Sequence, residues 1–242
     1  MGAPLRPDAS SREGGAARPA LSERIRVATW NVHEEAQRAP YLQDLLGGRL
    51  DATEYALLVA QHYVIYGAIE AAAAVNDDPV VAPFLSPALD RAPALASDLE
   101  YLLGPGWRSE YVVAEATERY RAHIDAVCRD SGPALLAHHY VCYLGALSGG
   151  QIIGRLIVRV FGFEDHHGTE YYRFPDVPSP SAHKDHYREL IDSLPWDDAT
   201  QQALLDEILV AYRHNTDVLL ELGRLVPQTL PPSSSSTLDD DT

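Results

Sequence analysis

Apolar side chains recur at a helical period through nearly the whole of this chain, and this pattern restricts the fold more than any other feature. Between residues 21 and 222 they return every three or four positions, and no run of β-branched residues alternates with polar ones. Prolines and glycines divide the pattern at short connections. We therefore predict an all-α, single-domain fold of the bundle type.

The same signals predict where the helices begin and end. Ser22 is the expected N-cap of the first helix, Pro40 would end it, and a turn should follow at 41–46. The segment 51–54 predicts a capping box for a second helix that reaches about Ala74. Further helices are predicted at about 91–103, 110–130, 132–161, 180–194 and 198–222, with Gly223 as the stop of the last one.

The two ends of the chain differ in composition from its middle. Residues 1–20 are rich in Gly, Pro and Ser and lack an apolar stretch, which predicts a disordered leader without a secretion signal. Residues 226–242 are predicted to be a disordered acidic Ser/Pro tail, which leaves 21–225 for the folded domain. Polar side chains interrupt the longest apolar region, 55–75, so we expect a buried helix and no membrane span.

Charge and cysteine content exclude several classes of function. The 19 Lys and Arg are outnumbered by 35 Asp and Glu, so the net charge is −16. This balance argues against binding to nucleic acid or to an anionic membrane surface. Two cysteines, Cys128 and Cys142, are too few for a disulfide framework or a four-thiolate metal site. We expect a reduced, cytoplasmic protein that acts as a monomer.

One segment is unfavourable for the helix that its periodicity predicts. YVCYLGALSGGQ, residues 140–151, contains Gly145, Gly149 and Gly150, and Gly154 follows. Each glycine inside a helix costs about 1 kcal/mol relative to alanine. Gly145 and Gly149 are four residues apart and share a face, which gives a strip without side chains. Such a strip suits either a close helix–helix crossing or a flat ligand that lies against the backbone.

Two further groups of residues suit an anionic ligand that contains a metal. Arg26 and His33 are seven residues apart on the first helix, hence on one face and separated by about 10.5 Å along its axis. A neutral imidazole can bind a metal, and an arginine can pair with a carboxylate. Lys184 and Arg188 form one of the few local concentrations of positive charge. A structural histidine and a solvated basic face are the alternative interpretations.

Together these segments resemble the heme oxygenase family, particularly its soluble bacterial members. The similarity is carried by HEEAQ from His33, by HHYVCYLGALSGGQ at 138–151 and by KDHYR at 184–188, and it covers about 21–222. LSGGQ alone is not specific, because unrelated ATPases carry it, but the phosphate loop that those proteins need is absent from this sequence. The resemblance implies that heme lies between a proximal helix and a kinked, glycine-rich distal helix.

The resemblance also implies a role for each matching position. His33 would be the axial ligand of the heme iron, and Gln37 would support its ring through a hydrogen bond. Gly145 and Gly149 would pass close over the porphyrin and direct oxygen to its α-meso carbon, while Tyr66 would belong to the water network of the pocket. The positions that match propionate-binding residues are Arg26, Tyr140, Lys184 and Arg188.

Three positions depart from the family pattern. Family members read LGDLSGGQ, and here Ala146 replaces the aspartate that holds water on the oxygen-binding side of the heme. Cys142 replaces a common arginine of the same polar network. Arg26 stands where the family often has lysine, which keeps the charge and changes the donor geometry. Without the aspartate, peroxidase-like chemistry competes with oxygenation.

The resemblance implies an enzyme that converts heme b, O2 and reducing equivalents into biliverdin, iron and carbon monoxide, with a reductase or ferredoxin as the external electron donor. The alternative is a heme carrier, sensor or weak peroxidase whose oxygenase activity is impaired because of Ala146. A third interpretation is a di-iron bundle, which needs paired Glu-x-x-His motifs on facing helices. The chain contains one such motif, at 164–167, in a predicted loop.

Overall fold

Helices and the connections between them make up residues 18–226, the part of the chain that the computed structural model describes, and no strand occurs in this range. The all-α prediction is confirmed. The α-helices are α1 (Leu21–Gln37), α2 (Pro40–Leu46), α3 (Ala52–Val75), α4 (Ala92–Leu103), α5 (Glu115–Val127), α6 (Gly132–His139), α7 (Gln151–Phe161), α8 (Pro180–Asp192) and α9 (Asp198–Leu225). The expected leader at 1–20 and tail at 226–242 lie almost entirely outside the described residues and stay predictions.

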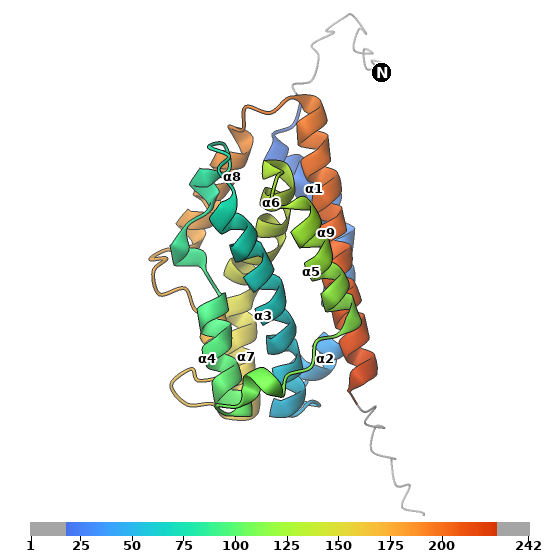
Figure 1. Cartoon of the computed structure of the whole chain (residues 1–242), viewed down its shortest axis with the longest axis vertical. Coiled ribbons are helices and arrows are strands. Elements are labelled where there is room, and N and C mark those ends of the chain that lie inside the picture. The colour runs from blue at the N-terminus through green and yellow to red at the C-terminus, as the bar shows by residue number, and fades with distance from the viewer. Residues whose placement is uncertain (1–17, 227–242) are drawn as a thin grey trace, which may run out of the picture.

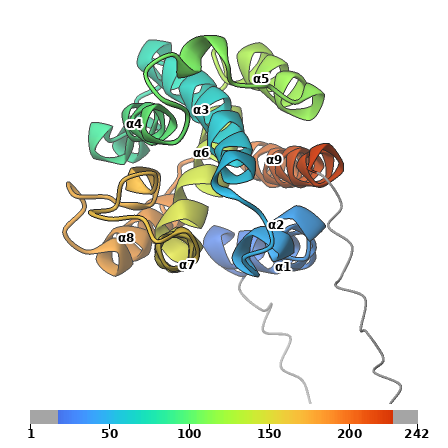
Figure 2. The ribbon, with the colours of Figure 1, turned by 90° about the horizontal axis from the view of Figure 1, so that it is seen from below.

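The helices α6 and α7 belong to one long stretch, residues 132–161, which we call the α6–α7 run. It passes through the middle of the molecule, with α3, α4 and α5 on one side and α1 and α2 on the other (Figure 2). The long helix α9 lies along this run and packs against α1, α5 and α6 (Figure 1). The first and last helices of the described chain are therefore neighbours.

Two stretches have the length and apolar composition of membrane-crossing helices, namely α3 and the α6–α7 run. Half of the most apolar window in each is buried inside the bundle. Core helices of water-soluble proteins have the same length and composition, so these two stretches are weak evidence for a membrane span.

Side-chain caps confirm one predicted helix start and correct another. The Asp51 carboxylate accepts a hydrogen bond from the Glu54 N–H at 2.8 Å, and the Glu54 carboxylate accepts one from the Asp51 N–H at 2.7 Å, which is the predicted capping box. Ser22 is not the N-cap of α1, because it lies inside the helix. Its amide and hydroxyl donate to the Asp192 carboxylate at 2.7 and 2.8 Å. These bonds tie the start of α1 to the end of α8.

Two further boundaries differ from the predictions because of tertiary contacts and a proline. Residues 40–46 form α2 and not a turn, since Pro40 occupies the first helical position, where its missing N–H is tolerated. Helix α5 begins at Glu115 and not at 110. The buried Gln61 of α3 donates to the Val112 carbonyl and accepts from the Ala114 N–H, both at 2.9 Å, and holds this segment outside the helix.

The last helix begins at Asp198, as predicted, but ends three residues later than predicted. Its N-cap is Asp197, whose carboxylate accepts from the Thr200 N–H at 2.8 Å. The helix continues past Gly223 to Leu225. Gly223 lies beside the backbone and Cβ of Tyr41 in α2, so it is a position where two helices pack and not a helix stop.

The middle of the α6–α7 run is not α-helical. Two π-helical segments, Tyr140–Leu144 and Ala146–Gly150, separate α6 from α7, and we call residues 140–150 the π segment. In a π-helix the hydrogen bonds span five residues, and such segments occur at kinks and at functional sites. Glycines destabilise an α-helix, and here they lie where the backbone does not form α-helical hydrogen bonds.

The glycines of the run occupy two faces with different surroundings. A Cβ atom added to Gly154 would lie 2.8 Å from the Cβ of Tyr172, in the 3-10 turn η6 (Glu170–Tyr172), and one added to Gly150 would lie 3.3 Å from the Tyr172 ring. A Cβ atom added to Gly145 or Gly149 would meet nothing within 4 Å. Gly150 and Gly154 therefore serve a tight crossing, whereas Gly145 and Gly149 present bare backbone to open space.

We expect Gly154→Ala to destabilise the protein by about 1–3 kcal/mol, because its Cβ would overlap Tyr172 in a packed interior. Gly67→Ala is the matched control: Gly67 lies inside α3 with nothing within 4 Å of its Cβ position, so this change should stabilise by up to about 1 kcal/mol through helix propensity. Chemical unfolding followed by circular dichroism measures both. A Gly154→Ala protein as stable as Gly67→Ala would contradict the proposed crossing.

Candidate functional site

The predicted metal ligand His33 lies on the exposed side of α1, in its last two turns. Its ring meets the ring of Tyr212 on α9 edge to face, with 6.3 Å between centroids. The amide nitrogen of Gln37 lies 3.5 Å from His33 Nε2. Gln37 thus contacts the predicted ring, but only at the limit of hydrogen-bond distance. The hydrogen bond from Gln37 to His33 Nε2 is therefore weak, and a metal ion could replace it.

Tyr212 links this part of α1 to the π segment. Burial raises the pKa of Tyr212, and the nearby Tyr140 and Cys142 raise it further. Burial also raises the pKa of Tyr140, while the guanidinium of Arg188 on α8 opposes that rise. The Tyr140 ring lies 6.3 Å from the ring of Tyr187, also on α8. Side chains from α1, α9, α8 and the π segment thus meet in one region.

The predicted anion-binding side chains of α1 and α8 are held by weak partners. Arg26 pairs with Glu23 at 2.6 Å and Arg188 with Asp185 at 2.7 Å, and both pairs are exposed and lie within one helix. Lys184 is half-buried and has no ion pair within the described chain. Exposed pairs of this kind contribute about 0–1 kcal/mol. An anionic ligand can therefore replace the carboxylates of Arg26 and Arg188.

The bonds between Ser22 and Asp192 place the two helices that carry these cations in contact. Arg26 follows Ser22 by one helical turn, and Arg188 precedes Asp192 by one turn, so each lies one turn from a residue that joins the two helices. Arg26, Lys184 and Arg188 are cations in a chain whose net charge is −16. The arrangement suits the carboxylates of a ligand located between the helices.

The bare strip of the π segment fits a flat ligand. Gly145 is exposed and Gly149 is half-buried, and open space lies where their side chains would be. Ala146 occupies the adjacent, closed face: it is 5% exposed, and its Cβ lies 3.8 Å from where a Cβ of Gly150 would be. A planar macrocycle such as heme can contact backbone only where side chains are missing. The residues present on this strip therefore fit heme.

The predicted pocket residue Tyr66 is buried and binds the backbone of the π segment. Its hydroxyl donates to the Cys142 carbonyl at 2.8 Å and lies 2.7 Å from the Tyr171 hydroxyl. Since the single proton of Tyr66 is used for the carbonyl, Tyr171 is the donor in the second bond. Burial holds the pKa of Tyr66 well above its usual value, so it stays protonated at neutral pH. No motif in the sequence marked Tyr171.

Cys142 joins the π segment to a second buried network. Its Sγ lies 3.9 Å from the Tyr120 hydroxyl, which is 3.1 Å from His138 Nδ1 and accepts from the Asn215 amide at 3.3 Å. Burial raises the pKa of Cys142 to about 12, so a neutral thiol stands where the family commonly has an arginine. Hydrogen bonds from His138, together with His123, hold the pKa of Glu207 at about 2.

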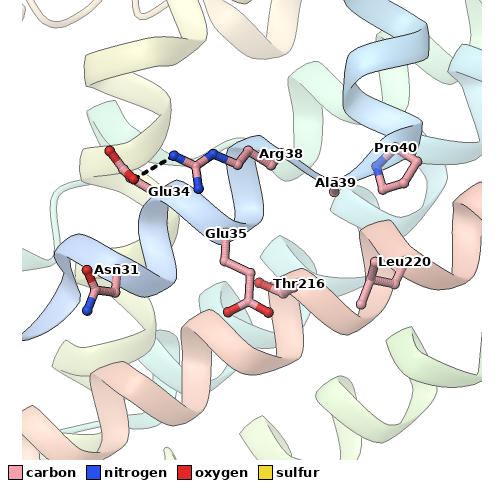
Figure 3. A pocket seen from close by; sticks show the side chains of 8 residues that line it. All are labelled: Asn31, Glu34, Glu35, Arg38, Ala39, Pro40, Thr216 and Leu220. Carbon is pink, nitrogen blue, oxygen red and sulfur yellow. Dashed lines mark hydrogen bonds and ion pairs between the residues drawn. The ribbon is translucent and has the colours of Figure 1, made fainter.

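A pocket of about 420 Å³ lies between α1 and α9, next to this region. Figure 3 shows the ion pair between Glu34 and Arg38 at its edge, with Glu35 and Thr216 on facing helices. Its lining residues are Asn31, Glu34, Glu35, Arg38, Ala39, Pro40, Thr216 and Leu220. His33 is not among them, and two carboxylates disfavour an anionic ligand. This pocket is therefore separate from the candidate heme site.

The di-iron interpretation does not fit the structure. Glu164 and His167 are exposed and belong to a turn closed by the bond from the His167 N–H to the Glu164 carbonyl at 3.0 Å. They lie in the connection after α7 and not on facing helices. The paired helical motifs that a di-iron bundle requires are not formed by these residues.

Known proteins resemble the chain over most of its length. Residues 19–221 match the model of the family described as heme oxygenase. The chain is 36% identical over 211 residues to a heme oxygenase of Takifugu rubripes, covering 86% of this chain and 76% of that protein. It is 33% identical over 208 residues to heme oxygenase 1 of Nostoc sp., covering 85% and 87%.

Solved structures agree with these relatives. Heme oxygenase-2 of Synechocystis sp., in complex with heme and NO, has a TM-score of 0.81 with 30% identity and covers 86% of each chain. Heme oxygenase-1 of the same cyanobacterium, in complex with heme, has a TM-score of 0.79 with 31% identity, covering 84% of this chain and 92% of that one. The chain belongs to the heme oxygenase family.

Proposed function

We propose that this protein is a heme oxygenase that cleaves heme b to biliverdin, iron and carbon monoxide, with O2 as co-substrate. The observation that carries the proposal is the strip of Gly145 and Gly149, which faces open space while the adjacent face of the same helix is packed. The strip lies on the stretch whose sequence matches the family, and the relatives that match are heme oxygenases. An external reductase or ferredoxin would supply the electrons, and we propose a cytoplasmic monomer.

His33 and the cations of α1 and α8 would hold the substrate from one side. The imidazole of His33 would bind the iron, the atom at which bound heme supplies oxygen chemistry. Arg26 and Arg188 would exchange their exposed carboxylate partners for the propionates, and Lys184 and Tyr140 would add donors. Charge-assisted bonds of this kind fix direction as well as position. They would set the rotation of heme in its plane, and hence the meso carbon that faces the glycine strip.

The polar groups of the distal side offer little acid–base capacity. Tyr66 donates its proton to a backbone carbonyl, and its raised pKa keeps that proton bound. Ala146 carries no acceptor, and Cys142 is a neutral, buried thiol. Proton delivery would therefore depend on water that enters along the open strip. This shortage of acid–base groups would limit the rate of turnover.

The alternative of a heme carrier, sensor or weak peroxidase uses the same pocket and is less favoured. Both curated relatives described above and both solved structures are named heme oxygenases. The one residue that motivates the alternative is Ala146, and its replacement affects the handling of protons rather than the binding of heme. Turnover separates the two functions directly.

We expect one equivalent of heme with an electron donor in air to lose its Soret band and to gain the red absorbance of biliverdin. His33→Ala should remain helical by circular dichroism but lose axial coordination, and His167→Ala, an exposed histidine, should behave as wild type. Persistence of heme in the wild-type protein under these conditions would refute the enzyme assignment. A His33→Ala protein with the wild-type heme spectrum would show that another histidine is the ligand.

Replacing Lys184 and Arg188 together by alanine should weaken heme binding and allow the macrocycle to rotate, because bonds to the propionates are lost. Remaining turnover should then give mixed biliverdin isomers, resolved by chromatography. Arg119 and Arg121 on α5 are also exposed cations with acidic partners, and their double replacement is the control. Unchanged affinity with a single isomer in the α8 variant would show that Lys184 and Arg188 are surface charges only.

Ala146→Asp should increase the rate of biliverdin formation about tenfold or more, because a carboxylate can hold water beside the oxygen-binding side of heme, and positioned proton transfer is typically worth roughly 10²–10⁴-fold. Adding Cys142→Arg should increase it further by directing that carboxylate. Ala146→Leu has a similar shape without polar atoms and serves as the control. A wild-type rate that Ala146→Asp leaves unchanged would show that other groups organise proton delivery.

A further inference from the structure

Two histidines from two helices converge on one carboxylate oxygen of a third helix, in a part of the bundle that the heme proposal does not use. The Nε2 atoms of His123 on α5 and His138 on α6 lie 2.6 and 2.9 Å from Oε1 of Glu207 on α9. The potential ligand atoms of all three residues lie within 4.8 Å of one another. This is the spacing at which two imidazoles and a carboxylate can share one ion.

The cluster is enclosed on one side and reachable on the other. The side chain of His138 is fully buried, whereas 28% of His123 and 19% of Glu207 is exposed. An ion can therefore enter past His123 and keep a water molecule as a further ligand. The excess of acidic residues in the chain also favours cations near its surface.

The innermost ligand is already oriented by an outer partner. His138 Nδ1 lies 3.1 Å from the Tyr120 hydroxyl, and the Asn215 amide donates to the same hydroxyl at 3.3 Å. A histidine that binds a metal commonly donates its second ring N–H to such a partner, which fixes the tautomer and the ring plane. Here that bond turns His138 Nε2 toward Glu207. The positions of the ring and its partner suit a metal-binding histidine once its proton moves to Nδ1.

We propose that His123, His138 and Glu207 form a Zn²⁺ site with water in the fourth position. Imidazole nitrogens select zinc and other transition metals, whereas Ca²⁺ and Mg²⁺ prefer oxygen ligands. Two histidines and one glutamate with an open position form a known type of zinc site. The ion would link α5, α6 and α9, and through Tyr120 it would be connected to Cys142 in the π segment.

Binding requires small, defined adjustments. Zinc bonds to nitrogen and oxygen are about 2.0–2.2 Å, so tetrahedral ligand atoms lie about 3.3 Å apart, and the present separations must open by roughly half an ångström. Each histidine must also carry its proton on Nδ1 instead of donating it from Nε2 to Glu207. For His138, the acceptor for that Nδ1 proton is the Tyr120 oxygen. Exchange of tautomer leaves the charge of both rings unchanged.

Zinc titration of the full-length, heme-free protein tests the proposal, with isothermal calorimetry as the readout. We expect one equivalent to bind and to raise the thermal midpoint of unfolding, in the wild type and equally in His33→Ala, which removes the proposed heme ligand. His123→Gln and Glu207→Gln should each lower zinc affinity at least about 100-fold, since even outer-shell replacements typically cost 10–100-fold. His186→Gln, an exposed histidine on α8, should bind zinc as the wild type does.

A variant that fails to fold would be recognised by its circular dichroism spectrum. His123 and Glu207 are partly exposed, and circular dichroism without zinc should match that of the wild type. Co²⁺ provides a second readout, because a tetrahedral site gives it intense visible bands that His123→Gln should abolish. Absence of zinc binding in the wild type would overturn the proposal and leave a hydrogen-bonded cluster. Equal binding by wild type and His123→Gln would overturn it by placing the ion elsewhere.

Discussion

The contact of Tyr172 with Gly150 and Gly154 is the constraint on which the candidate site depends. It presses one face of the α6–α7 run against η6 so closely that no side chain fits at Gly154. With that face fixed, the neighbouring face that carries Gly145 and Gly149 has a defined direction and remains uncovered. The bare strip is therefore an outcome of packing elsewhere on the same helix. Within ten residues, glycine allows a tight crossing at one position and leaves bare backbone facing open space at another.

Buried hydroxyl groups hold the π segment in this position. Tyr171 donates to Tyr66, and Tyr66 donates to the Cys142 carbonyl. On the other side, Tyr120 lies between Cys142 and His138. These bonds satisfy polar groups that would otherwise be costly to bury. The same bonds occupy the hydroxyl protons of Tyr66 and Tyr171, and Ala146 has no polar side-chain atom.

Unlike the buried hydroxyls, the charged groups around the candidate site are exposed and weakly paired. Arg26 and Arg188 each hold a carboxylate of their own helix, three residues away. Exposed ion pairs contribute little free energy, so a dianionic ligand would compete with partners that bind these arginines only weakly. A rigid glycine strip and exchangeable cations together suit a ligand that is large, flat and apolar at its centre and anionic at its edge.

The sequence alone determined the helical class, the capping box at Asp51 and the matching of His33 and the 138–151 motif to a family, since periodicity, caps and motifs are local properties of the chain. It did not determine that α5 starts at Glu115, because the cause is a hydrogen bond from Gln61 in a distant helix.

The sequence also left the purpose of the glycines open between a helix crossing and a ligand platform. Only the tertiary structure separates the two groups, because the role of a missing side chain depends on what lies opposite to it: Gly154 lies against Tyr172, whereas Gly145 faces open space. The convergence of His123 and His138 on Glu207 has the same origin: residues 84 and 69 positions apart along the chain become neighbours only when their helices pack.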